Sequence, residues 1–262
     1  MSTLSGQRPI AIVTGANRAG RIGAATAVEL ARAGCDLVIT HRQDEPGIHA
    51  TAELCRNSTG GACVVQIESI NLEDLAAVER QSAALAATLP RIDVLVHNAS
   101  DYKPTPLEQL SADQLERAMR VNVLAPALVS RALAARLATS PLPARGAIVT
   151  MCDIHAMGEL GQPRKNFLAY GLSKAALLEL TLVLARELAP NVRVNAIAPG
   201  VVAFPTSGHE SSPELQKLYL QRVPLARAGT PEEAAAAVRW LALEATYCTG
   251  HILRLDGGRA VT

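Results

Sequence analysis

Short apolar runs alternate along the chain with longer stretches in which apolar residues recur at helical spacing. The runs rich in Val, Ile and Leu predict strands at residues 10–13, 36–40, 62–67, 92–96, 147–151, 192–197 and 251–255. The periodic stretches predict helices at 24–33, 47–56, 72–89, 111–138 and 167–190, and another around 234–237. This alternation favours a parallel sheet covered on both faces. The pattern therefore predicts one doubly wound α/β domain over residues 1–262, with a central parallel sheet of about seven strands.

Composition narrows the class of protein. Hydrophobic residues make up 49% of the chain and aromatic residues only 3%, so the core must be built from Ala, Val, Leu and Ile. The formal charge is +1, and the mixed charges show no footprint for nucleic acid or a membrane surface. The five cysteines form no C-x-x-C pair, the N-terminus has no apolar signal segment, and no apolar run reaches the ~18 residues of a membrane span. We expect a reduced, cytoplasmic protein that acts on a small molecule and holds no metal.

A tyrosine and a lysine stand four residues apart in the helical stretch that starts at Phe167. Tyr170 and Lys174 share one helix face, with their Cβ atoms about 5–6 Å apart. A lysine at this position favours the phenolate and lowers the tyrosine pKa from its usual value of about 10. The pair therefore suits proton transfer, although the same spacing also occurs by chance on helix surfaces.

The first predicted strand runs into a glycine-rich turn and a helix, with Gly15 and Gly23 in the turn. Glycines allow a pyrophosphate to approach the backbone, and the helix N-terminus stabilises its charge. The second predicted strand ends at His41-Arg42, and an arginine there accommodates the 2′-phosphate of NADP. Asp44 and Glu45 follow closely and leave NAD as an alternative.

These motifs together resemble the short-chain dehydrogenase/reductase family over essentially the whole chain, including Asn98-Ala99, Val121-Asn122-Val123 and Pro199-Gly200. The resemblance implies a Rossmann domain in which Asn122, Tyr170 and Lys174 are catalytic. In such enzymes the lysine also binds the nicotinamide ribose, and the asparagine holds a water of the proton relay. The residues implied for the cofactor, NADP(H), are Gly15, Arg18, Arg21, Ile22, Gly23, His41, Arg42, Asn71, Asn98, Ala99, Ser100, Tyr170, Lys174, Pro199 and Gly200.

Several departures from the family pattern are similar to one branch, the pteridine and dihydromonapterin reductases. Asp153 stands where the family has a catalytic serine, and Ser100 where glycine is usual. The branch implies a proton-relay carboxylate at Asp153, an aromatic that stacks on the pterin at Tyr102, and an arginine that contacts phosphate and substrate at Arg21. The implied substrate residues are thus Arg21, Ser100, Tyr102, Asp153 and Tyr170. In another alignment Thr150 or a neighbour would act in place of the serine.

The sequence therefore predicts an NADPH-dependent reductase that transfers a hydride to a C=N bond of a dihydropterin-like substrate, with protons supplied by Tyr170 and Asp153. An NADPH-dependent carbonyl reductase, for a 3-oxoacyl group or a ketone, is the alternative. A non-catalytic NADP-binding protein is a third possibility, which the intact proton-relay residues disfavour. Substrate choice is expected in the loop 201–223. Family resemblance also implies a homotetramer, in which Arg259 reaches a neighbour's substrate or remains a surface residue.

Overall fold

A single twisted sheet forms the centre of the molecule. The structure is a computed structural model and describes residues 4–43, 46–157, 163–204 and 211–262. Its seven strands are β1 (Ile10–Thr14), β2 (Asp36–His41), β3 (Val65–Ser69), β4 (Val94–His97), β5 (Gly146–Met151), β6 (Val192–Pro199) and β7 (Ile252–Leu255). All pairs are parallel, in the order β3-β2-β1-β4-β5-β6-β7. This confirms the predicted doubly wound fold and its seven strands.

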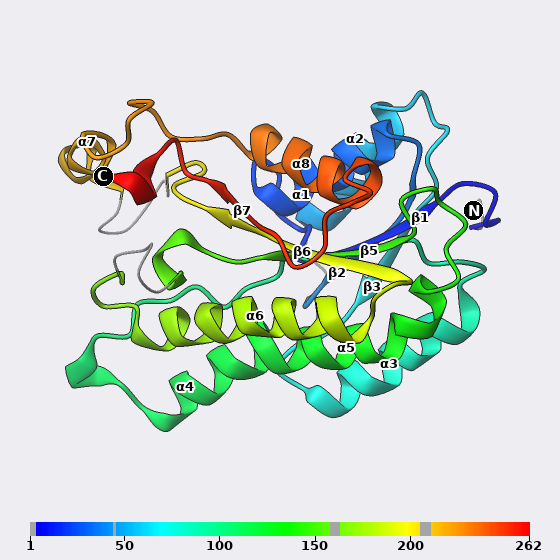
Figure 1. Cartoon of the computed structure of the whole chain (residues 1–262), viewed down its shortest axis with the longest axis horizontal. Coiled ribbons are helices and arrows are strands. Elements are labelled where there is room, and N and C mark those ends of the chain that lie inside the picture. Colours follow the sequence, from blue (N-terminus) through cyan, green and yellow to red (C-terminus); the bar gives the residue numbers. More distant parts are fainter. Residues whose placement is uncertain (1–3, 44–45, 158–162, 205–210) are drawn as a thin grey trace.

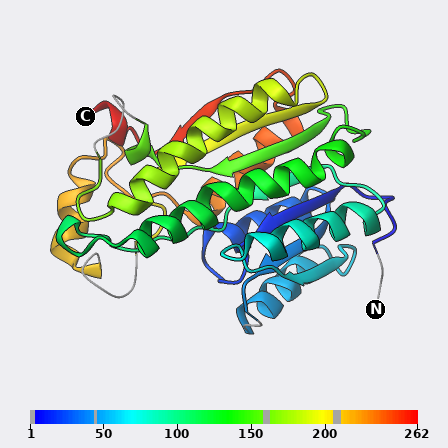
Figure 2. The same cartoon turned by 90° about the horizontal axis from the view of Figure 1, so that it is seen from below.

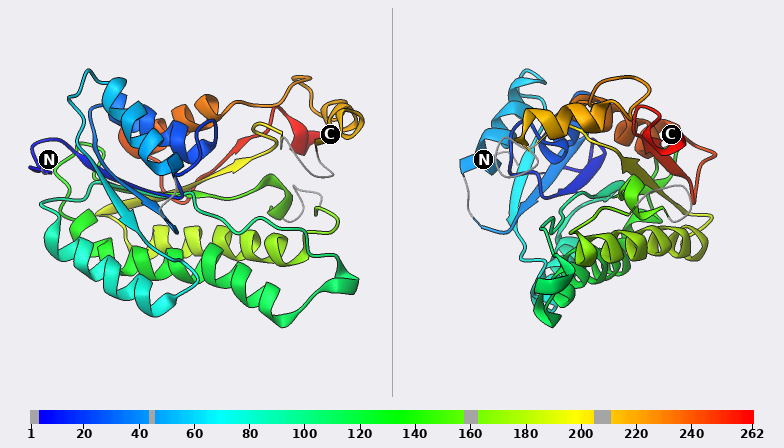
Figure 3. Two further views of the ribbon diagram at one scale, coloured as in Figure 1. Left: turned by 180° about the vertical axis from the view of Figure 1, so that it is seen from behind. Right: turned by 90° about the vertical axis from the view of Figure 1, so that its left-hand side faces the viewer.

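Helices cover both faces of the sheet (Figure 1). One face carries α1 (Ile22–Arg32), α2 (Pro46–Asn57) and α8 (Pro231–Arg239). The other carries α3 (Leu75–Thr88), α4 (Ala112–Met119), α5 (Ala125–Leu137) and α6 (Leu168–Glu187), and Figure 2 shows α3, α5 and α6 side by side. The short helix α7 (Pro213–Leu220) and the C-terminus lie together at one end of the molecule, and the segment that leads into β1 lies at the other (Figure 3).

Side chains on the two faces of each central strand pack into two separate hydrophobic cores. Val13 and Val96 pack in the core beneath α1 and α8, and Ile12 and Leu95 pack in the core beneath α3 and α5. Because successive side chains of a strand point to opposite faces, a strand buried on both sides must be apolar at every position. This is why the strands appear in the sequence as continuous apolar runs.

The predicted helix 111–138 is interrupted in the structure. Between α4 and α5 the chain makes a π-helical turn, η2 (Arg120–Leu124). The Ala125 amide donates to the Arg120 carbonyl, and Pro126 has no N–H with which to bond the Asn122 carbonyl. The prediction of one continuous helix was therefore wrong at Asn122, where the turn is wider.

Two helical stretches, 112–137 and 168–187, are long and apolar enough to cross a membrane by length and composition alone. Both belong to the helix layer on one face of the sheet. Core helices of globular domains meet the same criterion, so these helices do not indicate a membrane protein.

Candidate active site

A cavity of about 1160 Å³ opens at the carboxyl ends of the strands. It lies where the strand order reverses between β1 and β4, the usual ligand site of an open α/β sheet. Every residue that the sequence implied for cofactor or substrate lines this cavity. Of the implied catalytic residues, Asp153, Tyr170 and Lys174 line it and Asn122 does not. The described part of the loop 201–223 contributes Val201, Val202 and α7 residues, whereas 205–210 lie outside the described residues.

The turn between β1 and α1 forms one wall of the cavity. No side chain caps α1, whose first turn contains no acidic residue and presents Ile22 and Gly23 to the cavity. The Asn98 Nδ2 donates to the Gly15 carbonyl at 3.0 Å, and a Cβ on Gly23 would lie 2.4 Å from that nitrogen. The uncapped helix N-terminus and the close backbone therefore fit a dinucleotide pyrophosphate.

The end of β2 forms the next part of the wall. His41 is buried, and the Arg42 side chain is 58% exposed, with its Nη1 2.9 Å from Glu73 Oε1. Both residues line the cavity together with Asn71. An exposed guanidinium at this strand end fits the 2′-phosphate of NADP. Asp44 and Glu45, which left NAD open, lie outside the described residues.

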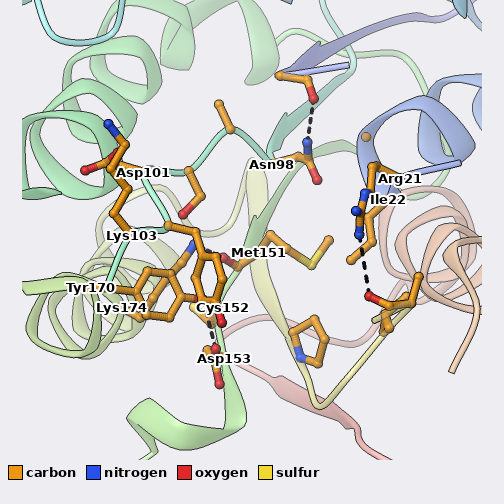
Figure 4. Close-up of a pocket in the computed structure, with 18 of the residues that line it drawn as sticks. Arg21, Ile22, Asn98, Asp101, Lys103, Met151, Cys152, Asp153, Tyr170 and Lys174 are labelled. Atoms are coloured by element: carbon orange, nitrogen blue, oxygen red, sulfur yellow. Dashed lines mark hydrogen bonds between the residues drawn. The ribbon is translucent and has the colours of Figure 1, made fainter. Parts of the chain in front are cut away.

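Across the cavity, Tyr170 and Asp153 form a buried hydrogen-bonded pair (Figure 4). The Tyr170 hydroxyl donates to Asp153 Oδ2 at 2.8 Å, while Asp153 Oδ1 accepts from the His155 amide at 2.8 Å. This second bond caps the short turn η3 (Ile154–Ala156) and fixes the carboxylate. The Lys174 Nζ donates to the Met151 carbonyl at 2.6 Å and lies 5.7 Å from the centre of the Tyr170 ring.

The pKa of Tyr170 is raised well above 10, which corrects the expectation that Lys174 lowers it. Burial is the main cause, and the charge and hydrogen bond of Asp153 add to it, while Arg164 acts in the opposite direction. Burial also lowers the pKa of Lys174, against the charges of Cys152 and Asp153. Tyr170 is therefore a neutral hydroxyl that can donate a proton.

Asn122 lies behind this group. It is fully buried in the π turn η2, and its Nδ2 donates to Ser173 Oγ at 2.8 Å and to the Asp101 carbonyl at 3.2 Å. Its Oδ1 accepts from the Asp101 amide at 2.7 Å. These bonds occupy both ends of the side-chain amide. Asn122 thus holds the loop after β4 against α6 and has no direct access to the cavity.

Tyr102 lies in a cluster of aromatic rings beside Tyr170. Its ring stacks on Phe167, with 4.8 Å between centroids and 22° between planes, and meets the Tyr170 ring edge-on at 4.8 Å. The Arg164 guanidinium lies over both the Tyr102 and Phe167 rings. Phe167 and Arg164 were not among the sequence candidates. The basic pair Arg164-Lys165, in the loop just before the Tyr170 helix, is the sequence feature that could have pointed to Arg164.

The C-terminal end of the chain also reaches the cavity. Arg259 and Tyr219 line it within one chain, and Arg259 is buried. The sequence had left Arg259 as a surface arginine or as one that reaches a neighbour's substrate, and the first of these is wrong. The Arg21 Nη1 donates to the Ala203 carbonyl at 3.5 Å (Figure 4). The described residues contain no cluster of three or more His, Cys, Asp or Glu side chains that could hold a metal ion.

Comparison with known proteins agrees with this arrangement. A family model described as enoyl-(acyl carrier protein) reductase matches residues 15–260. The chain is 32% identical to a 3-oxoacyl-[acyl-carrier-protein] reductase from Synechocystis sp., over 98% of each chain. It is also 32% identical to a glucose 1-dehydrogenase from Gluconobacter oxydans, over 94% of this chain and 90% of that protein.

Two solved structures show the same fold. A protein described as a short-chain alcohol dehydrogenase from Sinorhizobium meliloti matches with a TM-score of 0.86, 30% identity and 97% of each chain covered. A protein described as an NAD(P)-dependent gluconate 5-dehydrogenase from Beutenbergia cavernae, with bound NADP, matches with a TM-score of 0.85, 32% identity and 97% of each chain covered. None of these four relatives is named a pterin reductase, and their names do not support the expected branch. Fold, cavity and relatives agree on a coarser assignment: the chain is an oxidoreductase and belongs to the short-chain dehydrogenase/reductase family.

Proposed function

We propose that this protein is a cytoplasmic, NADPH-dependent reductase that acts on a C=N bond of a dihydropterin-like ring. The observation that carries the proposal is the buried hydrogen bond from the Tyr170 hydroxyl to Asp153. A carboxylate beside the proton donor opposes the negative charge that develops on a ketone oxygen. The same carboxylate can accept hydrogen bonds from the aminopyrimidine edge of a pterin.

In this proposal NADPH supplies the hydride, and the side chains of this chain supply protons and position the ring. Tyr170 is neutral and can donate its proton, while the Asp153 carboxylate accepts hydrogen bonds from the ring or relays the proton of Tyr170 to a ring nitrogen. The buried ammonium of Lys174 offsets the charge of Asp153 and points toward the wall formed by β5. The uncapped N-terminus of α1 and Arg42 would hold the cofactor phosphates.

The aromatic ring of Tyr102, which lines the cavity, also favours a planar substrate. Tyr102 is 42% exposed, and its ring is supported from behind by Phe167 and from the side by Tyr170. Such a supported ring offers a rigid aromatic surface on which a pterin can stack. The implied stacking role of Tyr102 is therefore retained here as part of the proposal.

Carbonyl reduction is the second candidate, and the names of the relatives favour it over pterin reduction. The Synechocystis relative is named a 3-oxoacyl-[acyl-carrier-protein] reductase, and the Gluconobacter relative a glucose 1-dehydrogenase. In that case the Tyr170 hydroxyl would donate to a carbonyl oxygen, and Asp153 would have to be protonated to support it. The two candidates therefore differ in what they require of Asp153.

An NADPH oxidation assay with dihydrobiopterin, dihydromonapterin, dihydrofolate and acetoacetyl thioesters tests the proposal. We expect turnover of a pterin, and we expect Asp153→Ser to lower it by about 10²-fold, the effect of a lost acid or base. Turnover of simple ketones should stay the same or rise. Asp153→Asn is the matched control for shape, because it keeps a hydrogen-bonding group while it removes the charge.

The opposite result, with pterin turnover unaffected and ketone turnover lost in Asp153→Ser, would assign the protein to the carbonyl reductases. Binding of NADPH without turnover of any acceptor would instead indicate the third possibility, a non-catalytic NADP-binding protein. The three candidate functions thus predict three different outcomes of the same set of assays.

A further inference from the structure

The part of the cavity away from the glycine-rich turn is rich in positive charge. Five cationic side chains line it, from the loops after β4 and before α6, from the end of α7 and from the C-terminus: Lys103, Arg164, Lys165, Arg222 and Arg259. Among the described lining residues the only carboxylates are Asp101 and Asp153. Asp101 forms an ion pair with Arg117, and Asp153 accepts the Tyr170 hydrogen bond. Among the described lining residues, these two carboxylates cannot balance five cations, so this part of the cavity carries a net positive charge.

Arg259 is the most unusual of these cations because it is buried. It is only 5% exposed, and its Nε has no hydrogen-bond partner among the residues that the structure describes. Its guanidinium carbon lies 5.7 Å from the centre of the Tyr219 ring, which supports it from one side. No described carboxylate forms an ion pair with Arg259. The nearby Asp256 uses its two oxygens to accept from the Gly258 and Ala260 amides at 2.9 and 2.8 Å.

A second buried arginine in the same chain shows what a structural arginine looks like here. Arg193 is also 5% exposed, but its guanidinium donates to the carbonyls of Ala144, Leu241, Ala242 and Ala245 at 2.6 to 2.9 Å. Buried arginines normally have such hydrogen-bond acceptors, because burying a charged donor without a partner destabilises the folded state. Arg259 has a comparable burial without comparable partners, and it faces a cavity.

We propose that Arg259 is the anchor of an anion subsite, which binds a carboxylate or phosphate substituent of the substrate. An arginine presents its N–H groups as a fork, the geometry that carboxylate and phosphate groups match, and the Tyr219 ring lies beside this one. The backbone holds the arginine in place: the turn η7 (Arg259–Val261) follows Gly258 in the left-handed conformation, at φ 88°. The substrate would thus be a ring compound that carries an anionic side group. That the anion belongs to the substrate rests on the proposed function.

Calorimetric titration of the NADP⁺-saturated protein with inorganic phosphate and, separately, with glutarate tests the subsite directly. Saturating NADP⁺ occupies the cofactor's own phosphate contacts, so that the probe reports another site. We expect saturable binding of at least one probe, weakened about tenfold or more in Arg259→Met, the scale of a lost charged hydrogen bond. Arg254→Met removes the same charge from an exposed position outside the cavity, and should leave the affinity within about twofold.

Arg259→Gln gives a second, shorter variant that keeps a hydrogen-bond donor without the charge, and it carries the test if Arg259→Met no longer binds NADPH. Binding of phosphate alone would indicate a phosphorylated substrate, and binding of glutarate alone a carboxylate, as in the glutamyl group of dihydrofolate. Wild-type protein that binds neither probe, or an Arg259→Gln variant that binds as tightly as wild type, would overturn the inference.

The outcome is independent of the reductase proposal. If the protein turns over no pterin but binds anions through Arg259, the subsite proposal holds and the pterin proposal is wrong. If the protein turns over a pterin but anion binding does not depend on Arg259, the reductase proposal holds and the subsite proposal is wrong.

Discussion

At the scale of single residues, sequence reasoning identified candidate catalytic groups that the structure brings together, and only part of their electrostatics. Tyr170, Lys174 and Asp153 were all identified from their positions, and all three line the cavity. The expectation that Lys174 lowers the Tyr170 pKa was wrong, whereas a carboxylate at Asp153 raises it as its position predicts. Helical spacing fixes the distance between Cβ atoms and not where a long side chain ends. Lys174 reaches the Met151 carbonyl, and Asp153 is the group that meets the phenol.

Cofactor preference is a prediction at this scale, and it depends on Arg42. The Arg42 guanidinium pairs with Glu73 at 2.9 Å on the rim of the cavity. We expect Arg42→Asp to weaken NADPH binding by about 1.5–3 kcal/mol, the scale of hydrogen bonds to a charged group, and to weaken NADH binding much less. Fluorescence titration with both cofactors measures the difference.

Glu73→Gln is the matched variant, because it releases Arg42 without touching the guanidinium. It should increase the preference for NADPH over NADH. Wild-type protein that binds NADH as tightly as NADPH would show that Arg42 does not select the cofactor.

At the scale of elements, the glycine-rich turn provides the sharpest prediction. A Cβ on Gly23 would lie 2.4 Å from Asn98 Nδ2 and 2.5 Å from the Gly15 carbonyl oxygen. Gly23→Ala should therefore cost about 1–3 kcal/mol of stability and weaken NADPH binding, because it forces the turn away from Asn98. Thermal unfolding and NADPH titration measure the two effects.

Gly171 is the control for this substitution. It lies in α6, and a Cβ there would meet nothing within 4 Å. Gly171→Ala should stabilise the protein by about 0.5–1 kcal/mol through helix propensity and leave NADPH affinity unchanged. Equal effects of the two substitutions would contradict the close packing described for the turn.

The same scale shows what the pattern of apolar residues could not predict. All seven strands were found, and the five inner ones are buried throughout. The edge strands β3 and β7 are only partly buried, and β3 begins at Val65 and not at residue 62. The break at η2 was missed because apolar periodicity continues through it, while the hydrogen bonds change register. Asn122 was found by its motif, yet its role in joining the Asp101 loop to Ser173 depends on contacts 21 and 51 residues apart.

At the scale of the whole molecule, the sequence predicted the layers and the site at the strand ends, and missed the contribution of the C-terminus. Alternating strands and helices leave few possible topologies, and ligands of such sheets bind where the strand order reverses. The packing of Arg259 on Tyr219 joins segments 40 positions apart along the chain. No local pattern encodes such a contact.

Assembly is the prediction that belongs to this scale. The helix α6 exposes Leu172, Leu182 and Val183, which are 56%, 37% and 46% exposed in the single chain. We expect a homotetramer in which such surfaces are buried, with a molar mass by light scattering of four times that of the chain. Val183→Glu should shift the protein to smaller species. Leu54→Glu, on the opposite helix layer and 47% exposed, should not.

A stable monomer at working concentration would remove the assembly proposal. It would leave the cavity unchanged, because every residue described as lining it comes from one chain.

The bond from Arg21 to the Ala203 carbonyl has a consequence for the binding of a second ligand. It joins the turn implied for the pyrophosphate to the segment that leads into α7. Ala203 has a φ of 61°, a left-handed conformation that is strained for a residue with a Cβ. A dinucleotide that draws Arg21 toward α1 would break this bond. We therefore expect the affinity for a second ligand beside Ala203 to depend on whether the dinucleotide is bound.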